Sequence, residues 1–541
     1  MYGRVKPQLS LHDVGSFFNM KLPDSSFYGQ LAAARDRLFK DEDFAELYKD
    51  TNNGRPSVPP SRLALTVLMQ ARDGVSDAEA IERTAYDLRW NLVLQLGAGE
   101  QLCAKSTLQL FRAHLVLSDT AKGIFKKSVS EAKRVGLLKG EALSVATDTK
   151  PIDGCGAVKD TYNLLATGMG MLIVALSKKD GKDKQEWMLE FGLGRYLQTS
   201  VKGSADIDWS DKDARESFLT LIVGDAHKLL KMANGQEPEI VAAADLLSKL
   251  LLQDVEVGTA DGVPTATIKQ GTAKGRIPSA TDPEVRHGRK SKSKRFKGHK
   301  AAVVTEITSG IIVGLEVLAG DAADSTGALE LTKQAEVVTE MEVRETLGDC
   351  AYGSGATRQE YEDEGRTLLA RVAHENGNKG MFTKSQFTID LDADTVTCPA
   401  GHTTNMVDEH ADGSTTFYFD EFCGGCPLRA QCTTSTLGRS IRVHPQERLL
   451  KEAREYQSTS KGKAHLRRRV IVENSLARLA HLGIGQARYK GHDKTRFQLA
   501  IACTVANLRR SWNWALEQTA NLNPVEEPMG LIGRPMKPVT V

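Results

Sequence analysis

Three acidic residues, far apart in the 541-residue chain, stand where their carboxylates can meet. Asp148 and Asp349 each end a predicted strand, EALSVATD and VRETLGD, and Glu473 lies in a predicted helix. Carboxylates that converge on one sheet repel one another, and divalent cations relieve this repulsion. Oxygen ligands suit Mg²⁺ or Mn²⁺, and two such ions activate a water or a 3′-hydroxyl against a phosphodiester. The three acids therefore indicate metal-dependent phosphoryl transfer.

Glu473 is unusual because the predicted helix around it, in residues 466–491, is otherwise apolar on that face. At about 3.6 residues per turn, one face carries Leu466, Val470, Glu473, Ala477 and Ala480. A buried carboxylate has to be paired, protonated or bound to a metal. Arg469, one turn earlier, is a suitable partner. A plain amphipathic helix with one buried ion pair is therefore the alternative to a metal site.

Four of the eight cysteines fall close together, in a segment rich in Gly, Thr and Asp. Their spacing is C-x24-C-x2-C-x5-C, at Cys398, Cys423, Cys426 and Cys432. Four thiolates suit tetrahedral Zn²⁺, which could staple a segment too small to fold unaided. His402 is a spare ligand. An iron–sulfur cluster and metal-free structural thiols are the alternatives.

Positive charge is concentrated in two segments, although the net charge of the chain is only +2. Residues 286–300 contain eight Lys or Arg and no acid, and residues 439–510 contain seventeen Lys or Arg against five acids. Such segments favour a polyanionic partner, most simply double-stranded DNA, contacted at its phosphates. A solvated charged face is the alternative.

The predicted elements give the chain an α/β organisation. The first 140 residues are mainly helical, with Ser76 and Glu79 forming a capping box. After the first strand come helical runs, a hairpin around residues 300–319, and then helix, strand, helix and strand. The N-terminus lacks the apolar core of a secretory signal, so we expect a cytoplasmic protein with no membrane segment.

Several blocks of the sequence resemble the DDE transposases of bacterial insertion sequences. The blocks are residues 61–94, 145–165, 294–325, 346–365 and 467–510. The second of these contains VATDTKPIDG, and the fourth contains GDCAYG, an aspartate followed by a small residue, any residue, tyrosine and glycine. The last contains RVIVE, then ARYKG, then NLR, and is long enough to be specific. A four-cysteine insertion occurs in part of that family.

The resemblance implies a ribonuclease H-like catalytic core and names its residues. Asp148, Asp349 and Glu473 are implied as the catalytic, Mg²⁺-binding triad, and Asp153 is the rival for the first position. Arg469 matches an arginine that contacts transposon-end DNA. A tyrosine and a lysine of a related signature are replaced here by Leu466 and Ala480, so Arg478, Arg488 and Lys490 are the candidates to substitute for the lysine. The full set of expected DNA contacts is Arg469, Arg289, Lys290, Lys297, Lys300, Arg488 and Lys490.

The sequence thus predicts a ribonuclease H-like mixed sheet flanked by helices, with added parts. These are an N-terminal helical domain for DNA-end binding or dimerisation (1–140), core segments (141–158 and 297–374), a mainly helical insertion (159–296), a cysteine-rich insertion (375–440), C-terminal core helices (441–520) and a disordered tail (521–541). The predicted activity is cleavage at transposon ends and strand transfer by at least a dimer. A nuclease of the same fold and a non-catalytic zinc-containing DNA-binding protein are the alternatives.

Overall fold

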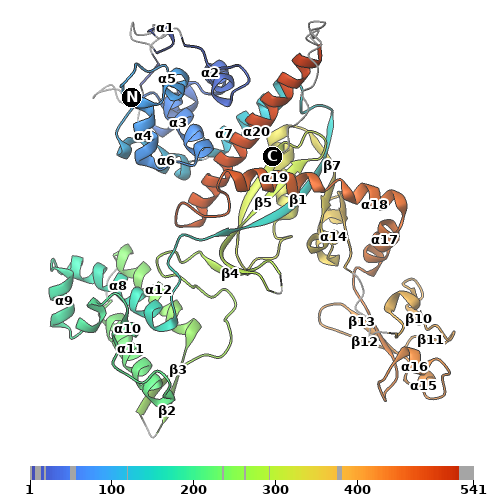
Figure 1. Ribbon diagram of the computed structural model, residues 1–541. Coiled ribbons are helices and arrows are strands. Elements are labelled where there is room, and N and C mark those ends of the chain that lie inside the picture. The colour runs from blue at the N-terminus through green and yellow to red at the C-terminus, as the bar shows by residue number, and fades with distance from the viewer. Residues whose placement is uncertain are drawn as a thin grey trace, which may run out of the picture. The chain divides into compact units, whose positions relative to one another are not determined.

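The computed structural model forms two compact units. One contains Met1–Gly140, Ser309–Ile311 and Ile501–Val541, and the other contains Glu141–Thr308 and Ile312–Ala500. Figure 1 labels their elements. The residues described are 3–5, 14–17, 20–48, 57–118, 120–233, 237–260, 263–291, 293–373 and 380–522. The expected disordered tail lies outside them from residue 523 onward, and the six-part division of the chain stays a prediction.

A six-stranded mixed sheet organises the larger unit. Its strands are β1 (Ala142–Asp153), β4 (Arg286–Arg289), β5 (Arg295–Glu306), β6 (Ile312–Ala319), β7 (Glu342–Gly348) and β8 (Thr367–Ala370). The main order is β6-β5-β1-β7-β8, and β4 pairs with the first residues of β5. β5 is antiparallel to β1 and β6, whereas β1, β7 and β8 run parallel. The expected hairpin is therefore β5–β6.

Helices cover this sheet. α13 (Ala328–Thr339) packs on β5, β6 and β7, and α14 (Gly355–Asp363) packs on β8. α19 (Val470–His481) packs on β1 and β5. β5 is buried over nearly its whole length, as expected for a strand covered on both faces. The mixed sheet flanked by helices confirms the predicted fold class, and it is consistent with a ribonuclease H-like core.

The C-terminal helices begin after the cysteine-rich segment. α17 (Glu447–Ser458) and α18 (Ser460–Arg467) precede α19, and α20 (His492–Leu522) follows it. α18 is tied to the sheet because His465 Nε2 lies 3.0 Å from Glu345 Oε1 on β7. Ser144 on β1 donates to the same carboxylate oxygen at 2.7 Å. This network holds the start of α19 beside β1 and β7.

The chain between β1 and β4 folds mainly as helices, as predicted. They are α8 (Thr161–Lys179), α9 (Lys184–Glu190), α10 (Val201–Ser204), α11 (Lys212–Met232) and α12 (Pro238–Asp254), with the 3-10 turn η2 (Gly194–Leu197). α8, α11 and α12 pack together around a core of apolar side chains that includes Leu172, Ile222 and Leu247. A hairpin of β2 (Val255–Ala260) and β3 (Val263–Ile268) follows α12.

The cysteine-rich segment folds as two small antiparallel sheets. One contains β9 (Thr388–Asp390), β10 (Thr395–Thr397) and β11 (Thr403–Thr404), and the other contains β12 (Val407–Glu409), β13 (Thr415–Tyr418) and β14 (Ser440–Val443). Two four-residue helices, α15 (Asp420–Cys423) and α16 (Arg429–Cys432), lie between β13 and β14. Eight buried residues form its core, and two of them are Cys423 and Cys432.

The smaller unit is helical. Its N-terminal elements are α1 (Val14–Phe17), α2 (Phe27–Leu38), η1 (Asp41–Leu47), α3 (Pro60–Asp73), α4 (Asp77–Tyr86), α5 (Leu88–Leu94), α6 (Lys105–Leu117) and α7 (Thr120–Arg134). Ser76 caps α4 as predicted, because its Oγ accepts from Glu79 N–H at 3.2 Å. Across the described residues of both units, no helix is long and apolar enough to cross a membrane.

Candidate active site and cysteine cluster

Asp148 and Asp349 lie at matching positions on neighbouring strands. The parallel pairing of β1 with β7 ends at Ala146 opposite Leu347, and each aspartate follows two residues later. The expectation that Asp148 ends its strand is wrong, because β1 continues to Asp153 through its pairing with β5. What ends near Asp148 is the pairing with β7. Asp148 and Asp349 therefore both lie just beyond the same end of the paired region of β1 and β7.

Asp349 is fixed by a tight turn after β7. Its Oδ1 accepts from the backbone N–H of Ala351 at 2.8 Å, which caps the short 3-10 turn η3 (Cys350–Tyr352). The turn is close-packed: a Cβ on Gly348 would lie 2.7 Å from that of Tyr352, and one on Gly353 would lie 2.0 Å from the carbonyl oxygen of Arg371. The two glycines thus let the chain fold back directly under the aspartate.

Glu473 lies on the exposed side of α19, not in a buried apolar stripe. Its side chain is 48% exposed, and Val470 is 47% exposed. The buried residues of α19 are Val472, Ser475, Leu476 and Leu479. Leu466, the first residue of the predicted stripe, belongs to α18, which ends at Arg467. The predicted stripe is therefore wrong, because α18 and α19 are two separate helices.

Arg469 and Glu473 form the ion pair that the sequence allowed. Arg469 Nη1 lies 2.9 Å from Glu473 Oε1. The pair is partly exposed, and exposed pairs of this kind contribute only about 0–1 kcal/mol. Glu473 can therefore exchange this arginine for another cation at little cost.

The other two carboxylates act electrostatically on Asp148. Burial raises the pKa of Asp148 from 3.8 to about 6, and the charges of Asp349 and Glu473 act in the same direction. The Thr149 backbone N–H and the Arg469 guanidinium oppose this shift of the pKa. Burial is the largest of these causes, and among the described residues the three acids are not placed so as to hold a metal ion.

Asp148→Asn tests the raised pKa of Asp148 in metal-free protein. A raised pKa means that the folded state binds the proton more tightly, so wild-type stability falls as pH rises from about 4 through about 6. The variant should therefore be more stable than wild type at about pH 8, with the gain shrinking through about pH 6 and absent below about pH 4. Thermal unfolding in EDTA measures this, and an equal loss of stability at every pH would contradict it.

Asp153, the rival for Asp148, is placed differently. It is exposed at the end of β1, where its backbone N–H donates to Gly485 at 2.9 Å and its carbonyl accepts from Ala487 N–H at 2.8 Å. Its contacts therefore fasten β1 to the loop after α19. Asp349 and Glu473 raise the pKa of Asp148, five residues earlier, so we retain Asp148 as the first aspartate.

Tyr352 is a residue that the sequence analysis quoted but did not assign to the site. The residue is 1% exposed. Burial raises the pKa of its hydroxyl, and the charges of Asp148, Asp324 and Asp349 act in the same direction. Tyr352 is therefore a buried neighbour of the two aspartates, close enough for their charges to act on its hydroxyl. The signal was its fixed place after Asp349 in the sequence GDCAYG.

The four cysteines surround one small cavity. It has a volume of about 20 Å³, enough for a single water or ion, and its lining also includes His402. Burial raises the pKa of the Cys432 thiol and Arg439 opposes this, while Cys423, Cys398 and Cys426 raise the pKa further. Cysteines spread over residues 398–432 thus converge, and their number and type suit Zn²⁺. Among the described residues, however, no three His, Cys, Asp or Glu are placed so as to hold a metal ion.

Two family models match separate parts of the chain. Residues 397–512 match the family described as "Transposase DDE domain", and residues 16–114 match "Transposase domain (DUF772)". Both matches support a DDE transposase of an insertion sequence. Its function is DNA transposition, which includes DNA binding. No curated protein and no solved structure matches it.

The two matches cover only part of the transposase's candidate site. The DDE match includes Glu473 and all four cysteines, whereas Asp148 and Asp349 lie outside it. DDE transposases generally use a divalent metal ion, so metal dependence is supported in that general form. The identity of the metal, the roles of the three acids and membership of a four-cysteine sub-group stay predictions.

Six of the seven predicted DNA contacts fall into two groups, and the seventh, Arg469, pairs with Glu473. Five side chains are exposed: Arg289, Lys290, Lys297, Arg488 and Lys490. The basic segment 286–300 is a hairpin rather than a loop, because Arg286–Arg289 of β4 pairs with the start of β5. Lys300 is different, since it is 7% exposed and its Nζ lies 2.8 Å from Asp324 Oδ1. Lys300 therefore forms a structural ion pair with Asp324, and the prediction that it contacts DNA is withdrawn.

Proposed function

We propose that the transposase cleaves DNA at the ends of its insertion sequence and joins the freed 3′-hydroxyls to target DNA. Asp148, Asp349 and Glu473 are the proposed metal ligands. The observation that carries the proposal is the matching placement of Asp148 and Asp349 after the paired residues of β1 and β7, in a chain that matches the transposase DDE domain; the raised pKa of Asp148 supports it. Carboxylates presented by neighbouring strands are suited to divalent cations.

Each acid has a defined part in this proposal. Asp148 and Asp349 are presented by adjacent strands, and the Ala351 N–H orients Asp349. Glu473 turns from Arg469 toward the two aspartates, which frees the Arg469 guanidinium for a DNA phosphate. Divalent cations, when bound, would supply activation of the attacking water or hydroxyl and stabilisation of the leaving oxygen. At neutral pH Asp148 is mostly ionised, because its pKa of about 6 lies below that pH.

DNA phosphates are the proposed partners of the exposed cations. Arg289, Lys290 and Lys297 come from the β4–β5 hairpin, whereas Arg488 and Lys490 follow α19. Contacts of this kind position the duplex without reading its sequence. Because two transposon ends have to be processed, we further propose that at least two copies of the chain act together on DNA.

Zinc is the proposed occupant of the cavity among the four cysteines. Its four thiols match the ligand number of a structural zinc site. The backbone N–H of Arg439 donates to Cys423 Sγ at 3.4 Å, a contact that would orient a thiolate ligand. The small core of this segment has few apolar side chains, so a metal staple would stabilise it.

A joining assay tests the proposed reaction. Purified transposase, Mg²⁺ or Mn²⁺, and DNA carrying the flanks of the encoding gene should give cleavage at the element ends. Pre-cleaved ends with 3′-hydroxyls should then join to a supercoiled target, and EDTA should abolish both products. Cleavage without joining would assign a nuclease, and neither product from DNA that the protein demonstrably binds would assign a non-catalytic DNA-binding protein.

A further inference from the structure

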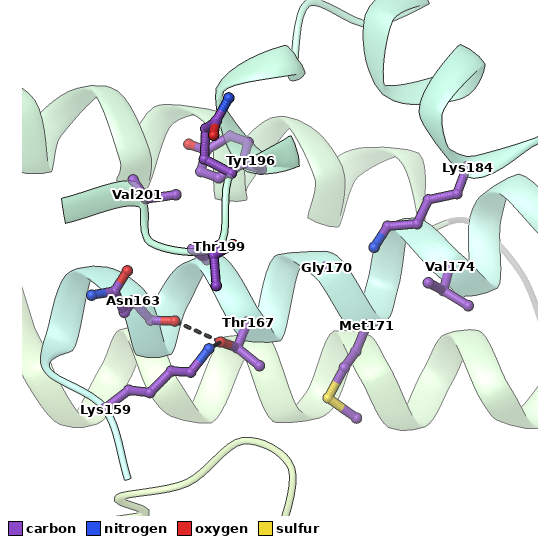
Figure 2. Close-up of a pocket in the computed structure, with 12 residues that line it drawn as sticks. Lys159, Asn163, Thr167, Gly170, Met171, Val174, Lys184, Tyr196, Thr199 and Val201 are labelled. Atoms are coloured by element: carbon purple, nitrogen blue, oxygen red, sulfur yellow. Dashed lines mark hydrogen bonds between the residues drawn. The ribbon is translucent and has the colours of Figure 1, made fainter. Parts of the chain in front are cut away.

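A hollow on α8, in the helical segment between β1 and β4, is not used by the proposed reaction. Its volume is about 480 Å³, within the range of about 300–1,000 Å³ typical of ligand sites. Figure 2 shows α8 as its floor, with the chain from Tyr196 to Val201 above it. Met171 and Val174 on its lining are about half exposed, so the hollow is open rather than closed. An open hollow suits a ligand that continues beyond it.

The charges that line this hollow are all positive. Lys159 and Lys184 are its only ionisable side chains apart from the Tyr196 phenol, and Figure 2 shows them approaching from opposite ends. Lys159 Nζ donates to Thr167 Oγ1 at 2.9 Å, which leaves two of its three donors for a ligand. In the part of the chain that the structure describes, neither ammonium group pairs with a carboxylate. The hollow is therefore suited to an anion.

Some other polar groups of the lining already form hydrogen bonds within the protein, and others are exposed to a ligand. The Tyr196 hydroxyl donates to Asp225 at 2.9 Å, and the Asn163 amide nitrogen donates to Asp160 at 2.7 Å. Gln198 and Thr199 are exposed at the rim, where their side chains can meet a ligand. Tyr196 and Asn163 thus form part of the wall. The ammonium groups of the two lysines, the Gln198 amide and the Thr199 hydroxyl can bind a ligand.

Gly170 keeps the floor of the hollow low. Glycine inside a helix costs about 1 kcal/mol relative to alanine, so its presence needs a reason. At Gly168 the reason is packing, because a Cβ there would lie 2.9 Å from Leu250 Cδ1. At Gly170 a Cβ would meet nothing within 4 Å. Packing therefore does not require Gly170, and the open space above it is the hollow itself.

We infer that this hollow binds a phosphate-bearing nucleotide unit, with its phosphate held by a lysine ammonium group and its sugar over Gly170. A phosphate accepts charge-assisted hydrogen bonds from an ammonium group. The apolar floor from Gly170 to Val174 suits the carbon face of a sugar. In a protein that binds DNA, the source we favour is a DNA strand; a free nucleotide offers the same chemistry. The site is additional to the DNA contacts proposed above.

Filling or neutralising the hollow tests the inference in the full-length protein. Gly170→Leu should weaken binding of a fluorescent element-end duplex about tenfold, the worth of one charge-assisted hydrogen bond. Lys184→Gln should reduce the slope of log affinity against log salt by about one, and Lys184→Arg should restore it. Gly224→Leu is the matched control, because it also lies inside a helix with nothing within 4 Å of its Cβ and is outside the hollow. Lys178→Gln, paired with Glu239 at 2.9 Å, controls for charge.

The outcomes separate the two sources of phosphate and the two proposals. Loss of duplex affinity in Gly170→Leu, with no loss in Gly224→Leu, assigns a DNA strand. Unchanged duplex affinity, with a deoxynucleoside monophosphate binding wild type but not Gly170→Leu, assigns a free nucleotide. Unchanged duplex affinity and salt slope, with no nucleotide bound by wild type, overturn the inference. None of these results depends on cleavage, so they leave the proposed reaction to its own assay.

Discussion

Asp148→Asn, Asp349→Asn and Glu473→Gln should each lower the rate of end cleavage about 10³-fold or more while leaving binding of end DNA nearly intact. Loss of one metal ligand removes several kcal/mol of transition-state stabilisation, and each 1.36 kcal/mol is tenfold in rate. The amide substitutions keep the size of each side chain, so the fold should persist. Cleavage rates with saturating DNA, together with gel-shift affinities, measure the two effects separately.

Asp153→Asn is the matched control for the first aspartate. It changes an exposed carboxylate on the same strand, and the contacts of Asp153 to Gly485 and Ala487 use its backbone, which the substitution retains. The variant should therefore cleave at close to the wild-type rate. Inactive Asp153→Asn combined with active Asp148→Asn would exchange the two assignments. Full activity in all three amide variants of the proposed triad would remove the catalytic proposal altogether.

The proximity of Asp148 and Asp349 could be predicted because the order of the strands determines it. A hairpin followed by a helix and a further strand places β7 beside β1, and equal offsets from the end of their pairing then align the two acids. The length of β1 could not be predicted from its own alternation, because its last residues are held by β5 alone. Pairing with a strand about 150 residues later decides where β1 ends.

The surroundings of Glu473 could not be predicted from periodicity. Residues 466–481 contain no glycine or proline, so nothing in the sequence marks the break between α18 and α19. Across that break the face of one helix does not continue into the next. The buried residues Val472, Leu476 and Leu479 keep the spacing of an apolar face, but Glu473 is outside it. The identity of the glutamate came from the resemblance, whereas its pairing with Arg469 came from helix geometry.

Lys300 shows that a run of basic residues does not by itself identify which of them can contact DNA. It lies in a run of cations, but β5 is covered on both faces and takes the lysine inward. There its Nζ donates to the Ala322 carbonyl at 2.6 Å and pairs with Asp324, which follows β6. A basic segment therefore identifies a charged neighbourhood, and only the sheet decides which of its residues face solvent.

Cys426→Ser should remove zinc from the transposase and lower its melting temperature. Structural zinc contributes about 10–16 kcal/mol to the folding of small domains, so the cysteine-rich segment, with its eight-residue core, should unfold without it. We expect about one zinc per wild-type chain by metal analysis and little in the variant. Cys155→Ser is the matched control, since Cys155 is an exposed thiol outside the cavity.

The same measurements separate zinc from the two alternatives for these cysteines. Iron in place of zinc, with a visible absorption band, would assign an iron–sulfur cluster. No metal in wild type, with Cys426→Ser as stable as Cys155→Ser, would make the four thiols ordinary core residues. A chelator provides a third measurement. If zinc stabilises this segment, chelation should lower the melting temperature of wild type toward that of Cys426→Ser. Chelation should not change the melting temperature of the variant. Triad amide variants should keep their zinc, because the cysteine cavity and the carboxylates share no side chain.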